Sequence, residues 1–571
     1  MSRGTPLAVL VALLVGHDAL HANDTIVVAQ HRYVVDTVLD LVLVAADVQL
    51  INGVHPGSES VITLDRHFSF ASQITDVEIG VEYSVVDTAG TPYTLYFTDL
   101  PLIWIDTPHT IVDEPKVDAV FRMIAPGEEV PVCDIGVEYR GASSQTFPKK
   151  SYRIGFRSDA LGTSTRDVSL LGMRSDDDWN LNAVYNEPLR MRSKLGQELW
   201  MDIHAPHYAG IEPEALSGVR MAHVELILNG RYNGVYTLGE PVDRKQLRLK
   251  SFNGNVRGKL YKAVDWAPGV EMTGVLPYDN NSLAWAGFEY EYPEEVVDWS
   301  DLHAFVSFVV TSGNVAFTDQ FPLHFHLDNA VDYFLLLNLM RAVDNTSKNT
   351  YIARHNAYSG YFYVPWDLDG TFSRVHDGTV DTATTSMLFN GMYQRLRWDC
   401  APDGFMQRAR QRWAALREGA FSVHELTARF HDAHEDLART GVYAREELAW
   451  SGYTYDPGEL ERVAQWIDQR TAYMDAWFLN TCSSAAIAER FNPDELQLYP
   501  NPARDRVFLE SDVLRPGMSI ALVDALGRAV RLLPVSSGRA SVDLGGVVPG
   551  LYRLNLMHEG RLVAGKALVV E

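Results

Sequence analysis

Acidic and amide side chains in the middle of the chain have the spacing of a phosphate-transfer site. Asp344 and Asn349 lie five residues apart, just after the apolar run Tyr333–Met340. Enzymes of the protein-kinase type use an Asp and an Asn at this spacing. The Asp orients the attacking hydroxyl and accepts its proton, while the Asn binds a metal ion on the phosphates. The same pair is also common in ordinary turns, so alone it does not identify an enzyme.

Two further carboxylates, Asp367 and Asp369, follow the strand-like segment Gly360–Val364. Carboxylates two positions apart after a strand suit a hard cation such as Mg²⁺, which prefers oxygen ligands. Gly370 allows the backbone to turn sharply behind them. Combined with the loop at 344–349, this pattern favours a site for a metal and a nucleotide over an ordinary turn.

A strand–loop–strand segment upstream supplies candidate cations. Tyr152, Ile154 and Phe156 alternate and so share one face of the second strand, and Lys150 falls in the same register. A Lys on an inward face is costly without an anionic partner. A nucleotide phosphate is one such partner, and a solvated strand edge is the alternative. The candidate phosphate contacts are Arg140, Ser143, Ser144, Lys149 and Lys150.

The elements that must position these side chains change in type along the chain. Alternating runs predict strands over residues 23 to about 98 and from about 102 to 237, with a helix near Pro188–Trp200. Helical periodicity dominates over 330–338 and from about 404 to 480. A strand-rich half followed by a helix-rich half predicts an α+β fold.

The first residues have the pattern of an export signal. A short basic start, Met1–Arg3, is followed by an apolar run over residues 6–16, which is too short to span a bilayer, and by small residues up to Ala22. We expect a signal peptide over residues 1–22. The alternative is a buried first strand or helix. No later segment has the apolar length of a membrane helix, so we expect no transmembrane segment in the mature chain.

The last residues predict a small antiparallel β-sandwich, since short alternating runs are separated by turns at Gly527 and Gly550. The opening Leu498–Pro502, the turn Pro549–Tyr552 and the final Gly565–Val570 resemble the C-terminal sorting domain of the type IX secretion system. This resemblance implies passage through the periplasm to the outer-membrane surface or the medium, with the type IX machinery as a partner. An ordinary accessory β-sandwich is the alternative.

Composition excludes some functions. An apolar fraction of 46% indicates a globular protein. The 49 basic and 74 acidic residues give a net charge of −25, which argues against a general nucleic-acid or anionic-membrane binder. Three cysteines are too few for a disulfide scaffold or a zinc site. At most one bridge can form, with Cys400–Cys482 as the candidate pair, and free buried thiols are the expectation.

The motifs of the middle region, in their order, resemble the spore-coat protein H (CotH) kinase family of atypical secreted or surface kinases. The resemblance covers roughly residues 102–400. Further segments that carry it are Leu170–Met173, Asp177–Trp179, Leu189–Trp200, Leu228–Tyr236, Leu260–Lys262 and Asp332–Phe334.

The resemblance implies a two-lobed, atypical protein-kinase-like domain that transfers the γ-phosphate of ATP to Ser or Thr of secreted or surface proteins. Asp344 would be the catalytic Asp, and Lys150 or Lys149 would contact phosphate. Asn349, Asp367 and Asp369 would bind Mg²⁺ or Mn²⁺. Unlike ordinary kinases, the chain has no His-Arg before Asp344 and no Asp-Phe-Gly. The candidate partner of the Lys is Glu198, and Glu240 is either near the hinge between lobes or on the surface.

The predicted organisation is therefore a signal peptide (1–22), a β-rich region (23–100), a CotH kinase-like domain (101–480), a linker (481–494) and a sorting domain (495–571). Two other functions stay open. One is a kinase-fold surface adhesin or binding protein without turnover, which would not need four oxygen ligands at these spacings. The other is a metal-dependent phosphoesterase, for which no His cluster supports a two-metal site.

Overall fold

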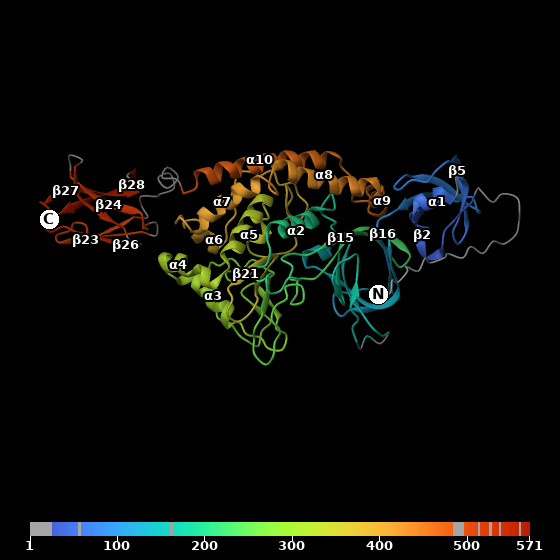
Figure 1. Cartoon of the computed structure of the whole chain (residues 1–571), viewed down its shortest axis with the longest axis horizontal. Helices are drawn as coiled ribbons and strands as arrows, with labels where there is room; N and C mark the ends of the chain where they lie inside the picture. Colours follow the sequence, from blue (N-terminus) through green and yellow to red (C-terminus); the bar gives the residue numbers. More distant parts are fainter. Residues whose placement is uncertain are drawn as a thin grey trace, which may run out of the picture.

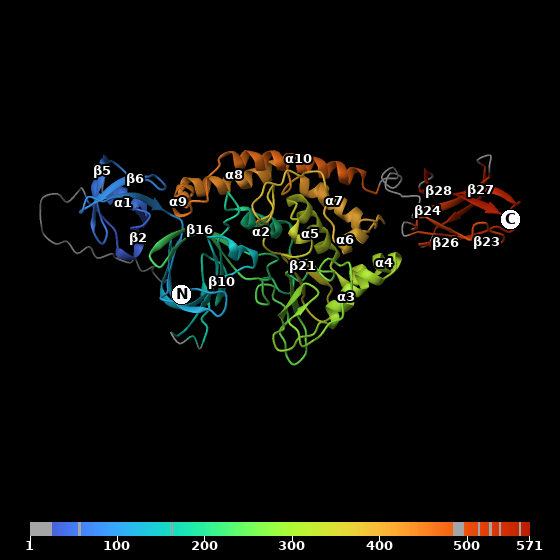
Figure 2. The ribbon, with the colours of Figure 1, turned by 180° about the vertical axis from the view of Figure 1, so that it is seen from behind.

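The structure is a computed structural model that describes residues 25–54, 59–159, 162, 164–482, 496–511, 514, 516–524, 528–535, 538–558 and 561–571. The predicted signal peptide and most of the predicted linker lie outside these residues. The chain forms two β-domains at opposite ends of an elongated molecule, with a barrel and a helical region between them (Figures 1 and 2). Among the described residues, no helix combines the length and apolar character that a bilayer crossing requires.

A seven-stranded sheet begins the described chain, in the order β1-β4-β5-β6-β7-β3-β2. Strand β3, next to the edge strand β2, is buried along its whole length because both faces are covered. Val42 and Val44 face the core of this sheet, whereas Leu41, Leu43 and Ala45 pack against the barrel. Its elements are β1 (Thr25–Val27), β2 (Tyr33–Asp36), β3 (Leu41–Ala45), α1 (Val48–Val54), β4 (Glu59–Thr63), β5 (His67–Ile74), β6 (Tyr83–Asp87) and β7 (Pro92–Thr98).

A closed seven-stranded barrel follows, in the order β10-β11-β14-β16-β15-β8-β9. Tyr152, Ile154 and Phe156 of β11 point into its core, as their alternation predicts. A two-stranded sheet, β12 (Val168–Ser169) and β13 (Ser175–Asp176), flanks the barrel. The barrel strands are β8 (Leu102–Asp106), β9 (Val117–Ala125), β10 (Glu128–Arg140), β11 (Ser151–Phe156), β14 (Asp178–Asn182), β15 (Met221–Leu228) and β16 (Arg231–Gly239).

The helical region is built around α5 (Leu327–Met340), which is buried on all sides except at its first two residues. A helix that is apolar all round must lie in a core, and a five-stranded sheet and further helices surround it (Figure 1). The sheet order is β18-β19-β17-β20-β21. Its strands are β17 (Lys259–Ala263), β18 (Ala284–Trp285), β19 (Phe288–Tyr292), β20 (Thr350–Arg354) and β21 (Tyr361–Pro365). The other helices are α2 (Arg192–Ile203), α3 (Ser300–Thr311), α4 (Asn314–His324), α6 (Gly391–Leu396), α7 (Phe405–Arg417), α8 (Val423–Arg439), α9 (Val442–Ala449) and α10 (Gly458–Asn480).

The C-terminal region is a small β-sandwich, as predicted. A three-stranded sheet, β22-β23-β26, and a four-stranded sheet, β25-β24-β27-β28, share one apolar core. The strands are β22 (Gln497–Tyr499), β23 (Arg506–Glu510), β24 (Met518–Val523), β25 (Ala529–Pro534), β26 (Arg539–Asp543), β27 (Gly550–His558) and β28 (Arg561–Val570).

The candidate bridge between Cys400 and Cys482 is present, and it leaves one free, buried thiol. Cys400 and Cys482 form a disulfide, with their Cα atoms 5.6 Å apart, and Cys133 is free and buried. The long helix α10 packs against α5 and α7 and so ends beside the segment between α6 and α7. That helix packing brings together two cysteines that are 82 residues apart in the sequence.

Candidate functional site

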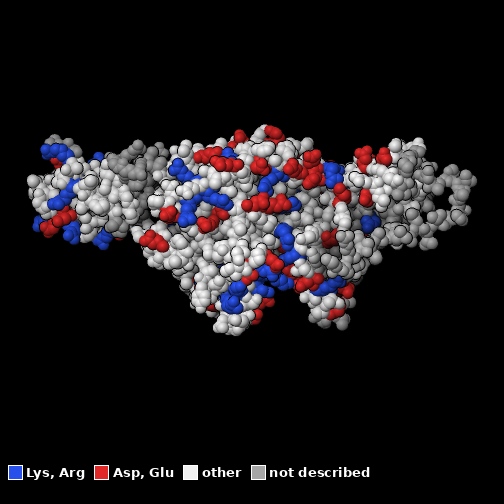
Figure 3. All heavy atoms as spheres, viewed as in Figure 1, with Lys and Arg blue, Asp and Glu red and all other residues white. Residues whose placement is uncertain are grey.

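The predicted carboxylates and one predicted cation meet between one end of the barrel and the end of β21. Arg140 ends β10, and its guanidinium lies 5.3 Å from the ring centre of Trp366, just after β21. The positive charge of Arg140 lowers the pKa of Asp367, and the negative charge of Asp344 raises it. In Figure 3, acidic and basic side chains gather beside a notch between the barrel and the helical region. The electrostatic interactions among these side chains place Arg140, Asp344, Asp367 and Asp369 in one group, which we call the candidate cleft.

The loop at 344–349 is held rigidly against β21. After α5, Arg341 adopts a left-handed conformation with φ 52°, and a short 3₁₀ turn spans Asp344–Thr346. The side-chain amide of Asn345 donates to the carbonyl of Asn349 (2.5 Å) and to the carbonyl of Trp366 (2.7 Å). These bonds link the loop with Asp344 and Asn349 to the segment with Asp367.

The backbone is strained at two predicted site residues. Asn349 and Asp367 have φ values of 55° and 54°, a region that non-glycine residues visit rarely. Residues held in this way concentrate at functional sites, because the surrounding structure must stabilise them. Their backbones are well held here, since the Asn349 amide donates to the carbonyl of Ala263 at 3.0 Å and its carbonyl accepts from the Trp366 amide at 3.1 Å.

Asp367 and Asp369 hold protons more tightly than ordinary carboxyls. Asp367 keeps an exposed surface, but desolvation by the surrounding protein raises its pKa; the charge of Arg140 opposes the rise and that of Asp344 adds to it. Desolvation and the neighbouring Asp367 charge raise the pKa of Asp369 well above its usual range, while a hydrogen bond with the Asn186 side chain opposes the rise. Two carboxylates that repel each other in one cleft form a favourable setting for a cation.

The donor set fits a hard divalent cation bound to phosphate. Asp344, Asn349, Asp367 and Asp369 offer carboxylate and amide oxygens, which Mg²⁺ prefers. The buried Oδ2 of Asp344 has no hydrogen-bond partner among the described residues and lies 3.0 Å from Lys348 Nζ as an ion pair. The guanidinium of Arg140 has the planar geometry that suits phosphate. The residues in the cleft are therefore compatible with Mg²⁺ and ATP.

The two predicted lysines point away from these carboxylates. Lys149, only 1% exposed, has Nζ 2.6 Å from the Glu446 carboxylate and donates at 2.6 Å to the Val235 carbonyl. Burial lowers the pKa of Lys149 to about 7, although Glu446 opposes this. Lys150 donates to the carbonyls of Gln145 and Phe147 in its own loop, at 2.6 and 2.5 Å. The prediction that Lys150 faces inward in the register of β11 is wrong, because β11 begins only at Ser151; the buried lysine is Lys149.

The predicted loop serines follow Arg140, whereas the two acidic candidates contact other side chains. Ser143 and Ser144 begin a 3₁₀ turn over Ser143–Thr146, three residues after Arg140. Glu198 pairs with Lys194 on its own helix, so its assignment as the partner of the Lys is wrong; that partner is Glu446. Glu240 is buried and accepts from the Arg174 amide at 2.9 Å.

Sequence reasoning missed several residues of the cleft. Lys262 and Lys348 both contribute positive charge at Asp367, and Asn182 accepts a hydrogen bond from Arg140. Lys348 sits inside the loop between Asp344 and Asn349, so its position was available as a signal. Lys262 and Asn182 reach the site only through the pairing of distant strands.

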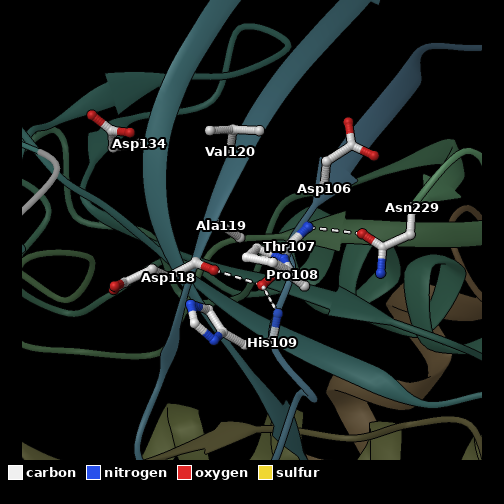
Figure 4. A pocket seen from close by; sticks show the side chains of 9 residues that line it. All are labelled: Asp106, Thr107, Pro108, His109, Asp118, Ala119, Val120, Asp134 and Asn229. Atoms are coloured by element: carbon white, nitrogen blue, oxygen red, sulfur yellow. Dashed lines mark hydrogen bonds between the residues drawn. The ribbon is translucent and has the colours of Figure 1, made fainter.

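Two other polar features do not coincide with this cleft. A hollow of about 790 Å³ opens on the outside of the barrel (Figure 4), lined by Asp106, Thr107, Pro108, His109, Asp118, Ala119, Val120, Asp134 and Asn229. Its carboxylates, on β8, β9 and β10, are not among the predicted metal ligands. Asp176 and Asp177 form an acidic group with Asp167, but Lys245 already lies 2.9 Å from each of the first two.

Two protein families match separate parts of the chain. The family described as "CotH kinase protein" matches residues 137–474, more than half of the chain. The family described as "Secretion system C-terminal sorting domain" matches residues 497–571. The second match confirms the sorting domain, and the protein is directed to the cell surface or outside the cell.

A curated protein is similar to the middle region. The inner spore coat protein H of Bacillus subtilis (strain 168) is 24% identical over 241 residues, which cover 42% of this chain and 59% of that protein. Among solved structures, the Pseudomonas fluorescens alkylpurine DNA glycosylase AlkC bound to abasic-site DNA aligns over 32% of this chain and 77% of its own. The identity there is 13% and the TM-score is 0.08, so this alignment carries no argument.

Proposed function

This chain belongs to the CotH kinase protein family, and from that premise we propose that it is an exported, atypical protein kinase. It would transfer the γ-phosphate of ATP to Ser or Thr of secreted or surface proteins. The barrel and the helical region would be the two lobes of a kinase-like fold, over the predicted span 101–480. The observation that carries the proposal is the convergence of Arg140, Asp344 and the Asp367–Asp369 pair in one cleft.

The side chains divide into three roles. Asp344 would orient the acceptor hydroxyl and take its proton, with Lys348 holding the carboxylate at 3.0 Å. Asn349, Asp367 and Asp369 would hold Mg²⁺ or Mn²⁺. ATP would supply the phosphoryl group, and the bound metal would neutralise its charge.

The cationic role moves from the lysines to Arg140. Its guanidinium lies over Trp366 and donates to Asn182, so its plane is fixed before any ligand arrives. A fixed guanidinium can bind phosphate oxygens with little loss of conformational freedom. Ser143 and Ser144, in the loop after Arg140, remain proposed phosphate contacts. Lys149 and Lys150 would shape this loop instead of contacting phosphate.

Export follows from the other family match. The sorting domain implies interaction with the type IX secretion machinery. We propose that residues 1–22 direct the chain to the periplasm and that the sorting domain then leads it across the outer membrane. Phosphorylation would take place during transit or where nucleotide is present outside the cell.

The test is labelling with γ-labelled ATP and Mg²⁺ or Mn²⁺, using the purified mature chain. Asp344→Asn and Asp367→Asn should each reduce labelling by about 10²-fold or more, as loss of a positioned base or of a metal ligand does. Asp328→Asn is the control, because its side chain is 86% exposed and lies in the first turn of α5, whereas Asp344 follows the other end of that helix. Full labelling in both cleft variants would reject the proposal.

A kinase-fold binding protein without turnover is the second candidate. It is favoured by one observation: Lys149 and Lys150, the lysines that the family resemblance assigns to phosphate, are both engaged elsewhere. This candidate requires that wild-type protein bind no Mg²⁺–ATP or bind it without labelling any protein. A thermal shift with nucleotide and metal, compared with Asp367→Asn, separates the two cases.

A further inference from the structure

The short helix α9 buries two adjacent charged residues, Arg445 and Glu446, and both are fully inaccessible to solvent. Successive residues of an α-helix point about 100° apart, so the two side chains reach different parts of the barrel. Neither residue belongs to a motif recognised in the sequence. Their partners place α9 between the N-terminal sheet and the candidate cleft.

Glu446 neutralises two buried cations from different segments. Its carboxylate lies 2.6 Å from Lys149 Nζ, at the end of the loop that follows Arg140, and 3.2 Å from Arg190 Nη2. It also accepts a hydrogen bond from the Val235 amide. Gly234 makes this approach possible, because a Cβ at that position would lie 2.1 Å from Glu446 Oε1.

The segment held through Arg190 is strained. Val184 and Arg190 have φ values of 43° and 63°, and a β-branched residue in this region is an outlier. Arg190 Nη1 donates to the carbonyls of Tyr185 and Glu187, at 2.6 and 3.1 Å, and also to that of Val184. Such a backbone persists only when its surroundings stabilise it. The Glu446 carboxylate supplies the charge that keeps the Arg190 guanidinium buried at this position.

The strained segment leads to the metal-side carboxylate. Asn186, in its middle, makes a side-chain hydrogen bond with Asp369 and donates at 2.5 Å to the carbonyl of His376. We propose that Glu446 is a positioning residue of the cleft: by bridging Lys149 and Arg190 it fixes the loop behind Arg140 and the segment that presents Asn186 to Asp369. The ligand of the cleft is taken from the proposed function; the mechanical role of Glu446 is independent of it.

Arg445 anchors α9 so that Glu446 can act in this way. Its Nε and Nη2 lie 2.8 and 2.7 Å from the buried carboxylate of Glu225 on β15. The hydroxyl of Thr98, at the end of the N-terminal sheet, donates to the same carboxylate at 2.8 Å, and that of Tyr232 does so at 2.7 Å. The helix is therefore fixed to both the barrel and the N-terminal sheet.

The experiment compares the full mature chain with Glu446→Gln, which keeps the side-chain shape but removes its charge. Hydrogen exchange should become faster over residues 141–149 and 183–190 but not over the C-terminal sandwich. The Mg²⁺ concentration for half-maximal ATP-induced thermal shift should rise about 10-fold, since residues that orient metal ligands typically change affinity by ~10–100-fold. Glu435→Gln, on the exposed side of α8, is the matched control and should match wild type.

A double variant, Lys149→Met with Glu446→Gln, separates positioning from general stability. Glu446→Gln leaves two buried cations without a counter-charge, which should lower the melting temperature. The double variant removes one of these cations, so its melting temperature should lie closer to that of wild type. The Mg²⁺ concentration for half-maximal thermal shift should stay raised, because Arg190 still lacks the charge of Glu446. If Glu446→Gln leaves both exchange segments and the Mg²⁺ requirement unchanged, the inference is overturned. If wild type binds no Mg²⁺–ATP, the proposed function fails, while the exchange data still decide the role of Glu446.

Discussion

In the proposed function, the guanidinium of Arg140 would take the role that a lysine has in ordinary kinases. Arg140 is held on one side by Asn182 and lies over Trp366 on the other. Lys149 is enclosed instead: it is 1% exposed, and its Nζ is bonded to Glu446 and to the Val235 carbonyl. A fixed, planar cation suits phosphate better than a flexible ammonium group.

Replacing Arg140 by lysine should therefore impair nucleotide binding although the charge is kept. Arg140→Lys should raise the Kd for Mg²⁺–ATP by about 10-fold, which corresponds to a loss of about 1.4 kcal/mol. Calorimetric titration measures this directly. Arg408→Lys provides the comparison, since Arg408 is partly exposed and pairs only loosely, at 3.4 Å, with Asp328. Equal affinities in wild type and Arg140→Lys would show that Arg140 does not contact phosphate.

At the scale of elements, local patterns predicted most strands and helices that carry the site. The alternation in β11, the apolar run of α5 and the C-terminal sandwich all agree with the structure. Helix α3 was missed although its buried residues, Leu302, Phe305, Val306 and Val309, have helical spacing. Helix α4 gives little local signal, since it buries only Phe317 and Phe321 and contains Pro322. Pairings across long distances were also missed: Lys149 and Glu446 are 297 residues apart, and only tertiary packing joins them.

Glu459, at the start of α10, holds the segment that follows Asp369 in place. Glu459 is buried and accepts hydrogen bonds from Arg192 (2.6 Å) and Arg374 (2.9 Å), which lie at the start of α2 and just after the Asp367–Asp369 segment. Arg192 also donates to the carbonyl of Phe372 at 3.2 Å. One carboxylate thus joins two helices to the segment that follows the predicted metal ligands.

This junction predicts a pH dependence of stability. Burial raises the pKa of Glu459, but hydrogen bonds from Arg374 and the charge of Arg192 outweigh it and lower the pKa to about 2, against 4.5 ordinarily. The folded state then binds the proton less tightly than the unfolded state. The stabilisation, on the order of 3 kcal/mol, is complete above pH 4.5 and is lost as the pH falls toward 2.

Thermal unfolding of Glu459→Gln against wild type measures this contribution. The difference in melting temperature should be large at pH 7 and should shrink steadily below about pH 4.5. Glu461→Gln, an exposed neighbour on the same helix, should show no such difference. A difference in melting temperature between wild type and Glu459→Gln that stays constant from pH 7 to pH 3 would contradict the pairing of Glu459 with Arg192 and Arg374.

For the whole molecule, the N-terminal sheet is a separate sheet that shares a buried core with the barrel. Leu41, Leu43 and Ala45 of β3 form one buried cluster with barrel residues such as Trp104 and Ile227. Polar contacts reinforce it, for Asp36 accepts from the Tyr232 amide at 2.9 Å. The predicted boundary near residue 100 therefore separates two segments of sequence that share a core.

Because this core is shared, we expect that shortening one buried side chain on the barrel side of the sheet lowers the stability of the protein strongly. Leu43→Ala should lower the free energy of unfolding by about 2–5 kcal/mol, because a buried leucine is removed from a packed interface. Leu50→Ala, in the same domain but 65% exposed, should change it by less than about 0.5 kcal/mol. Urea unfolding followed by tryptophan fluorescence reports the change, since Trp104 lies in the affected cluster.

The same substitution should also affect α9. Thr98 of the N-terminal sheet binds the Glu225 carboxylate, which in turn anchors Arg445 of α9. Leu43→Ala should therefore also speed hydrogen exchange in α9. Exchange in α9 that is unaffected while the N-terminal sheet loosens would show that the two segments fold independently.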